Sequence, residues 1–489
     1  MTAAPAAYPD FTVMPLAGEW RAGSSGKPGT DTDPWSGQVL TEFPLASAAD
    51  LDEACQAAAR AQPEWAARPP AARAAVMLAA AGVMEARKAE ITGWLIRETG
   101  GTVGKAELEW ELVRSVMLAA AAMPHQVTGR IMPSDVPGKE SRVYRQPAGV
   151  VAVISPWNFP LQLSSRSVAP ALAVGNAVVL KPASDTPVTG GLLLARVFEE
   201  AGLPPGLLSV VAGAGSEVGD AIVTHPVPRV ISFTGSTAVG EGITRQAGVK
   251  KLALELGGNG PLVVLDDADL GLAVEAAVFG SFFHQGQICM IANRLIVDRA
   301  VYDEFTQRFV ARASELAAGD PADPGTDIGP VINRRQLASV QDKLERSRAS
   351  GASQVLGGEP GGPAGLLLPP HVLLAGNDVP AAREEVFGPA ITVIRADDEQ
   401  DALRLANDTE YGLSSAVFTR DAERGVSFAL AVEAGMTHVN DSPVNDDSNT
   451  AFGGEKASGI GRFGGQWAVS EFTTDHWVSV QRSPRAYPV

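Results

Sequence analysis

The hydrophobic pattern divides the chain into a helical N-terminal part and a longer part in which strands alternate with helices. Up to about residue 122, apolar residues recur three and four positions apart, which is the period of an amphipathic helix. We expect three helical blocks, at residues 49–66, 71–100 and 103–122. Asp50 is placed to cap the first block, and Pro69 and Pro70 separate it from the second.

From residue 149 the pattern changes to short apolar runs separated by helical segments. The expected strands cover residues 149–155, 176–182, 207–213, 229–235 and 250–256, with helices at 160–174, 187–202, 216–223 and 237–247. A second pattern of this kind begins near Pro261, with strands at 261–268 and 391–396 and helices at 300–316 and 399–407. Apolar strands that alternate with helices predict parallel sheets covered on both faces. Such sheets bind nucleotides at the carboxyl ends of their strands.

Residues 126–146 interrupt this progression with a polar hairpin pattern that turns at Pro137 and Gly138. An insertion of this kind is either a surface loop or an arm between subunits. The chain also ends in a strand-like stretch, HWVSVQ, at residues 476–481.

Composition and charge narrow the class of protein. The chain has 489 residues, of which 45% are hydrophobic and 19% charged, so wholesale disorder is excluded. Its formal net charge of −17 argues against nucleic acid or an anionic membrane as a partner. The N-terminus lacks the pattern of a signal peptide, and no apolar run is long enough for a membrane span. We therefore expect a cytoplasmic enzyme.

The candidate chemistry begins with the two cysteines. Cys55 lies in an Ala-rich helical pattern, where a small buried apolar residue is expected. Cys289 lies in GQICM, within a loop-like stretch, and is either a packed thiol or a nucleophile. Two cysteines cannot form a disulfide framework, and a reactive thiol requires a reducing compartment.

Three further segments accompany this thiol. Asn158 lies in SPWNFP, Glu255 in LELGGN and Glu385 in EEVFGP. Taken singly, Asn158 would suit a turn, Glu255 would suit a charged strand end, and Glu385 would suit an acid on the surface. Together with GQICM, and in this order, they resemble the NAD(P)-dependent aldehyde dehydrogenase superfamily over about residues 18–480.

This resemblance implies an α/β fold with a Rossmann-type parallel-sheet cofactor domain, an α/β catalytic domain and a β-arm for oligomerisation. The corresponding parts of the chain are residues 1–125 with 147–257, residues 258–463, and residues 126–146 with 464–489. The hairpin and the C-terminal strand are then expected to pair across subunits of a homodimer or homotetramer. No metal site is expected.

The resemblance also implies catalytic roles. Cys289 is expected to attack the aldehyde carbonyl, giving a thiohemiacetal that loses hydride to a nicotinamide and becomes a thioester. Asn158 and the backbone N–H of Cys289 are expected to donate hydrogen bonds to the oxyanion. Glu255 is expected to activate the water that hydrolyses the thioester, and CoA-acylating relatives typically lack this base.

The cofactor, NAD or NADP, is expected at the ends of several strands. The segment FTGSTAVG, residues 233–240, follows a strand and opens a helix, so that backbone N–H groups face a pyrophosphate, although the GxGxxG fingerprint is absent. The expected contacts are Ile154, Ser155, Trp157, Lys181, Ser184, Gly215, Gly219, Phe233, Gly235, Ser236, Val239, Leu256, Gly257, Glu385 and Phe387.

Ser184 departs from the commonest pattern of the family. Strictly NAD-dependent members usually carry Glu at this position, two residues after the Pro of the KP dipeptide. Serine removes a charge that would repel a 2′-phosphate, and Lys181 could pair with that phosphate. We therefore expect both NAD+ and NADP+ to be used.

The substrate class rests on two segments, residues 158–172 and 435–454, which resemble the benzaldehyde, vanillin and salicylaldehyde dehydrogenase branch. That branch implies an aromatic aldehyde as substrate. The residues expected to line an apolar tunnel are Trp110, Phe283, Ile288 and Met290, each of which would equally suit a core position.

Three competing functions are compatible with the same sequence. One is an aliphatic or semialdehyde dehydrogenase of the same superfamily. Another is a non-catalytic, crystallin-like structural protein, which the intact Cys289, Glu255 and Asn158 argue against. The third is a cysteine hydrolase, for which His284 is the only histidine near the thiol in sequence.

Overall fold

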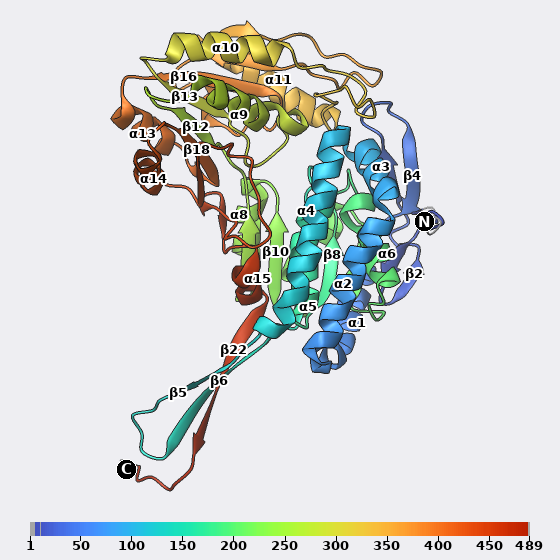
Figure 1. The fold of residues 1–489 in the computed structure, drawn as a ribbon. Helices are drawn as coiled ribbons and strands as arrows, with labels where there is room; N and C mark the ends of the chain where they lie inside the picture. Colours follow the sequence, from blue (N-terminus) through green and yellow to red (C-terminus); the bar gives the residue numbers. More distant parts are fainter. Residues whose placement is uncertain (1–4, 10, 488–489) are drawn as a thin grey trace.

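The computed structural model describes residues 5–9 and 11–487. Two large sheets lie at opposite ends of the molecule, each flanked by helices, and a long antiparallel arm projects from the first of them (Figure 1). This arrangement confirms the predicted α/β class.

The first sheet contains the strands predicted between residues 149 and 256. They are β7 (Val150–Ile154), β8 (Ala177–Lys181), β9 (Leu208–Val210), β10 (Val230–Thr234) and β11 (Lys251–Glu255), with β21 (Gly459–Ile460) added at one edge. The order is β21-β11-β10-β7-β8-β9, and all neighbours are parallel except β21, which is antiparallel to β11. Every residue of β8 and β10 is buried, as expected for strands covered on both faces.

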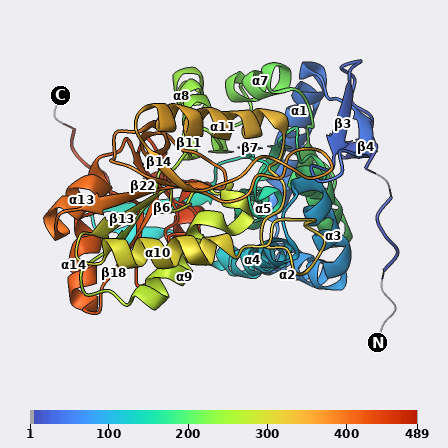
Figure 2. The same ribbon diagram turned by 90° about the horizontal axis from the view of Figure 1, so that it is seen from above.

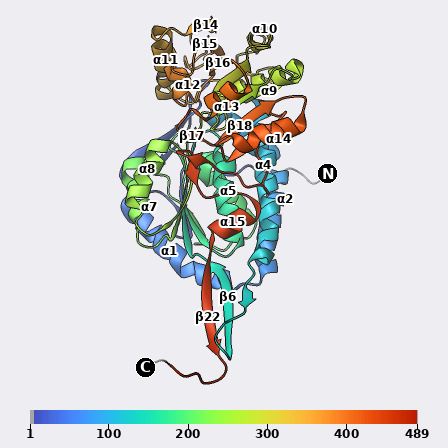
Figure 3. The ribbon, with the colours of Figure 1, turned by 90° about the vertical axis from the view of Figure 1, so that its left-hand side faces the viewer.

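Helices cover both faces of this sheet. They are α1 (Ala48–Ala67), α2 (Pro70–Ala86), α3 (Lys88–Thr99), α4 (Val103–Ala122), α5 (Pro160–Ala173), α6 (Leu193–Glu200), α7 (Asp220–Thr224) and α8 (Thr237–Gln246). Two π-helical turns, η2 (Val188–Leu192) and η3 (Gly215–Gly219), precede α6 and α7. Figure 3 shows α1, α7 and α8 on one side of the sheet and α4 and α5 on the other.

Two details of the N-terminal helices differ from the prediction. The cap of α1 is Ser47 rather than Asp50. Ser47 Oγ accepts a hydrogen bond from the Asp50 backbone N–H at 3.2 Å, and the Asp50 carboxylate accepts one from the Ser47 backbone N–H at 2.9 Å. The predicted second block is two helices, because the chain leaves helical geometry at Arg87, whose guanidinium binds Glu90 and Glu200. Periodicity alone did not reveal this break, since apolar positions continue across it.

The second sheet contains β12 (Pro261–Val264), β13 (Arg294–Asp298), β14 (Ser353–Leu356), β15 (His371–Leu374), β16 (Ala390–Ala396), β18 (Ser414–Phe418) and β19 (Met436–Val439). The order is β14-β15-β16-β13-β12-β18-β19, parallel except for β14. Its helices are α9 (Leu270–Phe282), α10 (Tyr302–Ser314), α11 (Arg334–Ala349), α12 (Pro380–Arg383), α13 (Glu399–Asn407) and α14 (Ala422–Ala431).

Alternate residues of the β12 strand face different halves of the core. Val263 packs with α11 and α13, whereas Leu262 and Val264 pack with α9 and α10. Figure 2 shows α11 on one side of these strands and α10 on the other. The second sheet is therefore also covered on both faces.

The arm is a three-stranded antiparallel sheet. It contains β5 (Arg130–Met132), β6 (Lys139–Pro147) and β22 (Thr473–Gln481), with β6 in the middle. The β22 and β6 strands pair along their whole length, from Thr473 opposite Pro147 to Gln481 opposite Lys139. This pairing lies within one chain, so the expectation that the hairpin and the C-terminal strand pair across subunits is wrong.

The C-terminal part of the predicted arm also begins later than expected. Residues 465–471 form α15 (Gly465–Glu471), which packs against α5 and the short 3-10 helix η1 (Met123–Gln126). Only the chain from Thr473 onward belongs to the arm sheet.

The remaining strands are short antiparallel pairs. They are β1 (Met14–Leu16) with β2 (Glu19–Arg21), β3 (Pro28–Thr32) with β4 (Val39–Pro44), and β17 (Tyr411–Gly412) with β20 (Glu455–Lys456). No helix in the described part of the chain has the length and apolar character needed to cross a membrane. The chain passes from the first sheet to the second between β11 and β12, while the domain division at residue 257 stays a prediction.

Candidate active site

Cys289 lies on a strained turn between α9 and β13. The turn begins with the 3-10 segment η4 (Phe283–Gly286), where His284, Gln285 and Gly286 have φ values of 49°, 55° and 67°. Two of these are not glycine, so the surrounding structure must hold them in the left-handed region. Gln285 Nε2 does this by donating hydrogen bonds to the carbonyl oxygens of Gly100 and Pro330, at 2.8 and 2.9 Å.

The two thiols have different surroundings. Cys55 is fully buried in the core around α1, and burial raises its pKa to about 12. Cys289 is partly exposed, and its pKa is raised first by desolvation and then by the nearby carboxylate of Glu255. Arg166 acts in the opposite direction. The reactive state of Cys289 therefore depends on the charge of its neighbours.

Glu255 is the last residue of β11 and is fully buried. Its Oε2 binds the guanidinium of Arg166 on α5, with Nη2 at 2.5 Å. Its Oε1 accepts no hydrogen bond from the described residues. Arg166 lies over the rings of Phe452 and Phe463, 4.3 and 4.5 Å from their centroids. One oxygen of Glu255 is thus held by Arg166, and the other is available to accept a hydrogen bond.

Arg166 is a site residue that the sequence prediction missed. It stands among small and apolar residues in SSRSVAPAL, a segment of α5 that is buried throughout. A cation in such a helix requires a buried anion as its partner. That requirement was the available signal, and Glu255 is the partner.

Asn158 lies just before α5 and is almost fully buried. Its Nδ2 donates a hydrogen bond to the backbone oxygen of Gln287 at 2.9 Å, two residues before Cys289. Gln287 is fixed in turn, because its Oε1 accepts the Ile332 backbone N–H at 3.0 Å. The structure therefore brings the predicted oxyanion donor to the cysteine loop.

The start of α5 is anchored by a buried carboxylate. Glu109 Oε1 on α4 accepts the backbone N–H groups of Leu161 and Gln162, at 2.9 and 3.1 Å. Its Oε2 binds Lys105 Nζ at 2.5 Å, and both charged side chains are fully buried. An anion at a helix N-terminus is favourable, so this pair fixes the helix that carries Arg166.

Two cavities meet at Cys289. One of about 240 Å³ is lined from α4, α5, α9, the cysteine loop and residues 444–452. The other, of about 250 Å³, opens at the carboxyl ends of β10 and β11. Cys289, Asn158 and Leu163 line both, so the thiol lies where they join.

The first cavity is largely apolar. Its apolar lining consists of Leu108, Leu112, Phe159, Leu163, Phe279, Ile288, Met290, Val444 and Phe452. The predicted Ile288 and Met290 are among them. Trp110 is not: its indole N–H donates to the Met84 carbonyl at 2.9 Å, and its ring packs in the core between α2 and α4. Phe283 is also absent, since it packs against Phe279 at 4.8 Å. Sequence spacing did not show which way these two rings point.

The second cavity contains about half of the predicted cofactor contacts. These are Trp157, Gly235, Ser236, Leu256, Gly257, Glu385 and Phe387. The α11 side chains of Gln336, Ser339 and Lys343 line it as well and were not predicted. Trp157 and Phe387 meet edge to face at 5.3 Å, and Phe387 has a φ of 55°.

The features of this cavity fit a dinucleotide. Ser236 stands at the N-cap of α8 without a side-chain cap, so the first N–H groups of the helix are free for an anion. Gly235 lies so close to Phe233 that an added Cβ would be 2.5 Å from the ring, so only glycine fits at this turn. Burial raises the pKa of Glu385 to about 7, and its Oε1 accepts the Gly258 N–H at 2.9 Å.

The other predicted cofactor residues lie outside this cavity. They are Ile154, Ser155, Lys181, Ser184, Gly215, Gly219, Phe233 and Val239. Lys181 ends β8, and its Nζ donates to the Pro182 carbonyl at 3.1 Å. An added Cβ at Gly219 would lie 3.7 Å from the Lys181 side chain, and Ser184 is exposed. Lys181 and Gly219 thus adjoin one another at the ends of neighbouring elements.

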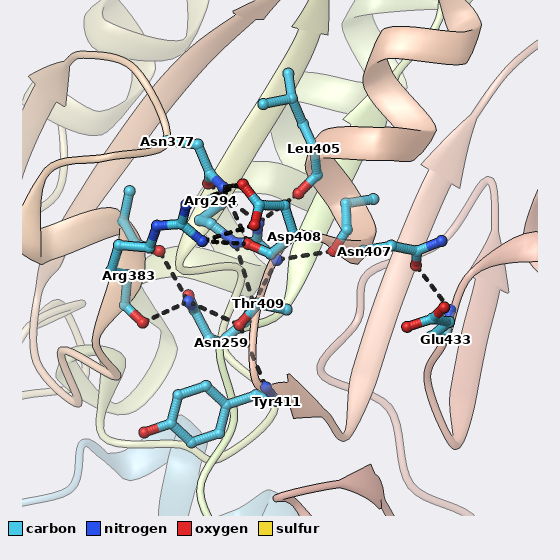
Figure 4. A network of polar contacts seen from close by, with 12 residues as sticks. Asn259, Arg294, Asn377, Arg383, Leu405, Asn407, Asp408, Thr409, Tyr411 and Glu433 are labelled. Carbon is cyan, nitrogen blue, oxygen red and sulfur yellow. Dashed lines mark hydrogen bonds and ion pairs between the residues drawn. The ribbon is translucent and has the colours of Figure 1, made fainter.

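A polar network that is buried at Arg294 and exposed at Arg383 lies beside the segment that carries Glu385 and Phe387 (Figure 4). Arg294, fully buried on β13, donates to the carbonyl oxygens of Leu405 and Ala406 at 2.7 and 3.0 Å. Asn259 Nδ2 donates to the Ala382 carbonyl at 2.8 Å, and Arg383 binds Asp408 at 2.8 Å. The last two bonds join residues 382 and 383, just before Glu385, to Asn259 ahead of β12 and to Asp408 at the end of α13.

Comparison with known proteins adds independent findings. A model of the aldehyde dehydrogenase family matches residues 20–478. A vanillin dehydrogenase of Corynebacterium glutamicum is 52% identical over 479 residues, covering 97% of this chain and 98% of that protein. The crystal structure of an NAD-dependent benzaldehyde dehydrogenase from Corynebacterium glutamicum has a TM-score of 0.90 and 50% identity, with 98% of each chain covered. That of a salicylaldehyde dehydrogenase from Pseudomonas putida G7, complexed with salicylaldehyde, has a TM-score of 0.94 and 36% identity, covering 98% of this chain and 99% of that one.

The charge of Glu255 should control the reactivity of Cys289. In Glu255→Gln, loss of the negative charge lowers the thiol pKa, so alkylation of Cys289 by iodoacetamide at pH 7.5 should be faster by roughly threefold or more. Peptide mapping after timed alkylation measures this, and Cys289→Ala shows the background from Cys55. An unchanged or slower rate would contradict the electrostatic link.

Proposed function

The chain belongs to the aldehyde dehydrogenase family, and from that premise we propose that it oxidises aromatic aldehydes to carboxylic acids with NAD+ or NADP+ as oxidant. The observation that carries the proposal is the position of Cys289 at the junction of the two cavities. One cavity is shaped and lined for an apolar aldehyde, and the other has the anion site and aromatic contacts of a nicotinamide dinucleotide.

Cys289 is the nucleophile in this proposal. Its thiol releases a proton to solvent, and the sulfur adds to the aldehyde carbon. The second N–H of the Asn158 amide and the backbone N–H of Cys289 then stabilise the oxyanion. The bound dinucleotide supplies a hydride acceptor, and loss of hydride from the tetrahedral carbon leaves a thioester on Cys289.

Glu255 then acts as the base for hydrolysis. Arg166 holds Oε2, while Oε1 is free to take a proton from the water that attacks the thioester. The carboxylic acid leaves as the Cys289 sulfur regains its proton. Arg166 supplies the opposite charge that a buried carboxylate requires as a partner.

The lining of the substrate cavity favours an aromatic aldehyde over a semialdehyde. Phe159, Phe279 and Phe452 offer ring surfaces to a flat apolar substrate. A semialdehyde carries a carboxylate that needs a free cation. Arg166 is the one cation among the described lining residues, and its charge is already paired with Glu255 through Nη2. The named relatives, which act on vanillin, benzaldehyde and salicylaldehyde, support the same choice.

Neither a cysteine hydrolase nor a non-catalytic structural protein is supported by the residues of the site. A cysteine hydrolase requires a base beside the thiol, but His284 is fully buried, packs edge-on against Phe159 and lines neither of the two cavities. A non-catalytic structural protein does not require a buried Arg166–Glu255 pair beside a thiol. The need for a reduced Cys289 favours the cytoplasm as the compartment.

A substrate panel tests the proposed function. We expect benzaldehyde to be oxidised with a kcat/KM at least about a hundredfold above that for succinic semialdehyde. Cys289→Ala should abolish turnover of both while cofactor binding, followed by fluorescence quenching, survives. A preference for the semialdehyde, or turnover by Cys289→Ala within about tenfold of wild type, would contradict the proposal.

Cofactor choice should depend on Ser184. Its exposed position after β8 leaves room for a 2′-phosphate, so we expect both NAD+ and NADP+ to support turnover. Ser184→Glu places a like charge near that phosphate and should raise the KM for NADP+ by about tenfold or more, with a much smaller change for NAD+. Ser184→Gln is the matched neutral control. A wild-type enzyme that already rejects NADP+ by more than about a thousandfold would show that another residue guards the site.

The arm is proposed to join copies of the chain into a homodimer or homotetramer. The β22 strand is an edge of the arm sheet and carries Trp477, which is 64% exposed, while Ile131 on the other edge strand is 76% exposed. Open edges with large exposed apolar side chains are typical of surfaces that another chain covers.

Deleting residues 476–489 should therefore give monomers or insoluble protein, measured by multi-angle light scattering. Deletion of residues 482–489 leaves β22 complete and should preserve the native assembly. A full-length chain that is monomeric in solution would contradict the role of the arm.

A further inference from the structure

The apolar substrate cavity has one polar wall that the proposed mechanism does not fully use. It is formed by Gln162 and Arg166 on α5 and by Asn445 and Asp446 on the segment that closes the cavity. Arg166 is committed to Glu255. Gln162 and Asp446 have no role in the chemistry at Cys289, yet both line the space where the body of the substrate lies.

The Asp446 carboxylate is fixed in position. Gln162 Nε2 donates a hydrogen bond to Asp446 Oδ2 at 2.7 Å. The Gln162 backbone is itself held by Glu109 Oε1 at 3.1 Å, so the buried charge pair on α4 supports this contact. No side chain of the described residues donates a hydrogen bond to Asp446 Oδ1, and the backbone N–H of Asp447 is the other donor near this carboxylate. Asp446 is partly exposed and lines both the substrate cavity and a neighbouring cavity beside α4, so an acceptor is left at the edge of a space whose other walls are mostly hydrocarbon.

The charge of Asp446 is set by its neighbours on three segments. Burial is the main cause that raises its pKa to about 6, while Arg166 on α5 lowers the pKa and Glu255 on β11 raises it. The backbone N–H of Asp447 and the amide of Gln162 also favour the ionised form. At neutral pH the side chain is thus a carboxylate, which accepts hydrogen bonds and donates none.

We propose that Asp446 selects aromatic aldehydes that carry a hydroxyl group on the ring, by accepting a hydrogen bond from that hydroxyl at Oδ1. The inference rests on the proposed function and names the substrate subclass of the same site. An unsubstituted ring displaces water from this acceptor without replacing its hydrogen bond, which is unfavourable, whereas a ring hydroxyl satisfies it. A site built to bond a substrate hydroxyl discriminates strongly against the analogue that lacks it.

The test compares selectivity ratios rather than single rates. The kcat/KM of each of 2-, 3- and 4-hydroxybenzaldehyde is divided by that of benzaldehyde for each enzyme. For at least one isomer this ratio should fall by about tenfold or more in Asp446→Leu, which keeps the size of the side chain and removes the acceptor. Asp446→Asn keeps one carbonyl oxygen and should give a smaller fall in the same isomer.

Asp447→Asn is the matched control. This substitution removes the same charge one position along, but Asp447 is exposed and does not line the substrate cavity. Its ratios should stay within about twofold of wild type. Cofactor binding by each variant shows that it is folded, and Asp446→Asn carries the test if Asp446→Leu is insoluble.

A second readout separates recognition from a merely structural role. In the wild type, the ratio for the affected isomer should fall as the pH drops through about 6, because protonation of Asp446 removes the free acceptor. In Asp446→Leu the ratio should not show this step. Dividing by benzaldehyde cancels the titration of groups that both substrates share.

The outcomes distinguish the two levels of the proposal. Ratios that stay within about twofold of wild type for all three isomers in both Asp446 variants would overturn the role of Asp446. Failure of the wild type to oxidise any of the four aldehydes would instead overturn the proposed function.

Discussion

The site depends on one buried ion pair, Arg166 with Glu255. Taking both charges out of water is costly, and the pair survives because its geometry is close and because two aromatic rings cover the guanidinium. The contact joins α5 to the end of β11, close enough to Cys289 for both charges to act on its thiol. Removing either partner would leave an unpaired buried charge between the two cavities. The same contact therefore affects both the stability of the fold and the reactivity of the site.

The geometry around that pair follows from two local constraints. The buried Glu109 carboxylate fixes the first turn of α5, and with it Asn158, Gln162 and Arg166. A run of left-handed residues before Cys289 turns the cysteine loop back toward this helix. Since both constraints are buried and hydrogen-bonded, the thiol is held where the two cavities meet instead of on a flexible loop.

Much of the fold could be predicted from the sequence, because buried parallel strands are continuous apolar runs and need no knowledge of their neighbours. The four motifs likewise placed Cys289, Glu255, Asn158 and Glu385 around one region. The directions in which side chains point could not be predicted. Trp110 and Phe283 are as apolar as the residues that line the cavity. Tertiary packing places Trp110 in the core and Phe283 against Phe279. The pairing of β6 with β22 within one chain could not be predicted either, because a strand-like sequence does not show which strand it will pair with.

If Cys289 carries the acyl group and Glu255 releases it, the acyl group can be trapped on the enzyme. Glu255→Gln, mixed with benzaldehyde and NAD+ and quenched in acid, would be digested and mapped by mass spectrometry. We expect a benzoyl adduct on the peptide that contains Cys289, with about one equivalent of NADH formed per subunit. An adduct on another residue, or steady turnover with no adduct, would contradict these roles of Cys289 and Glu255.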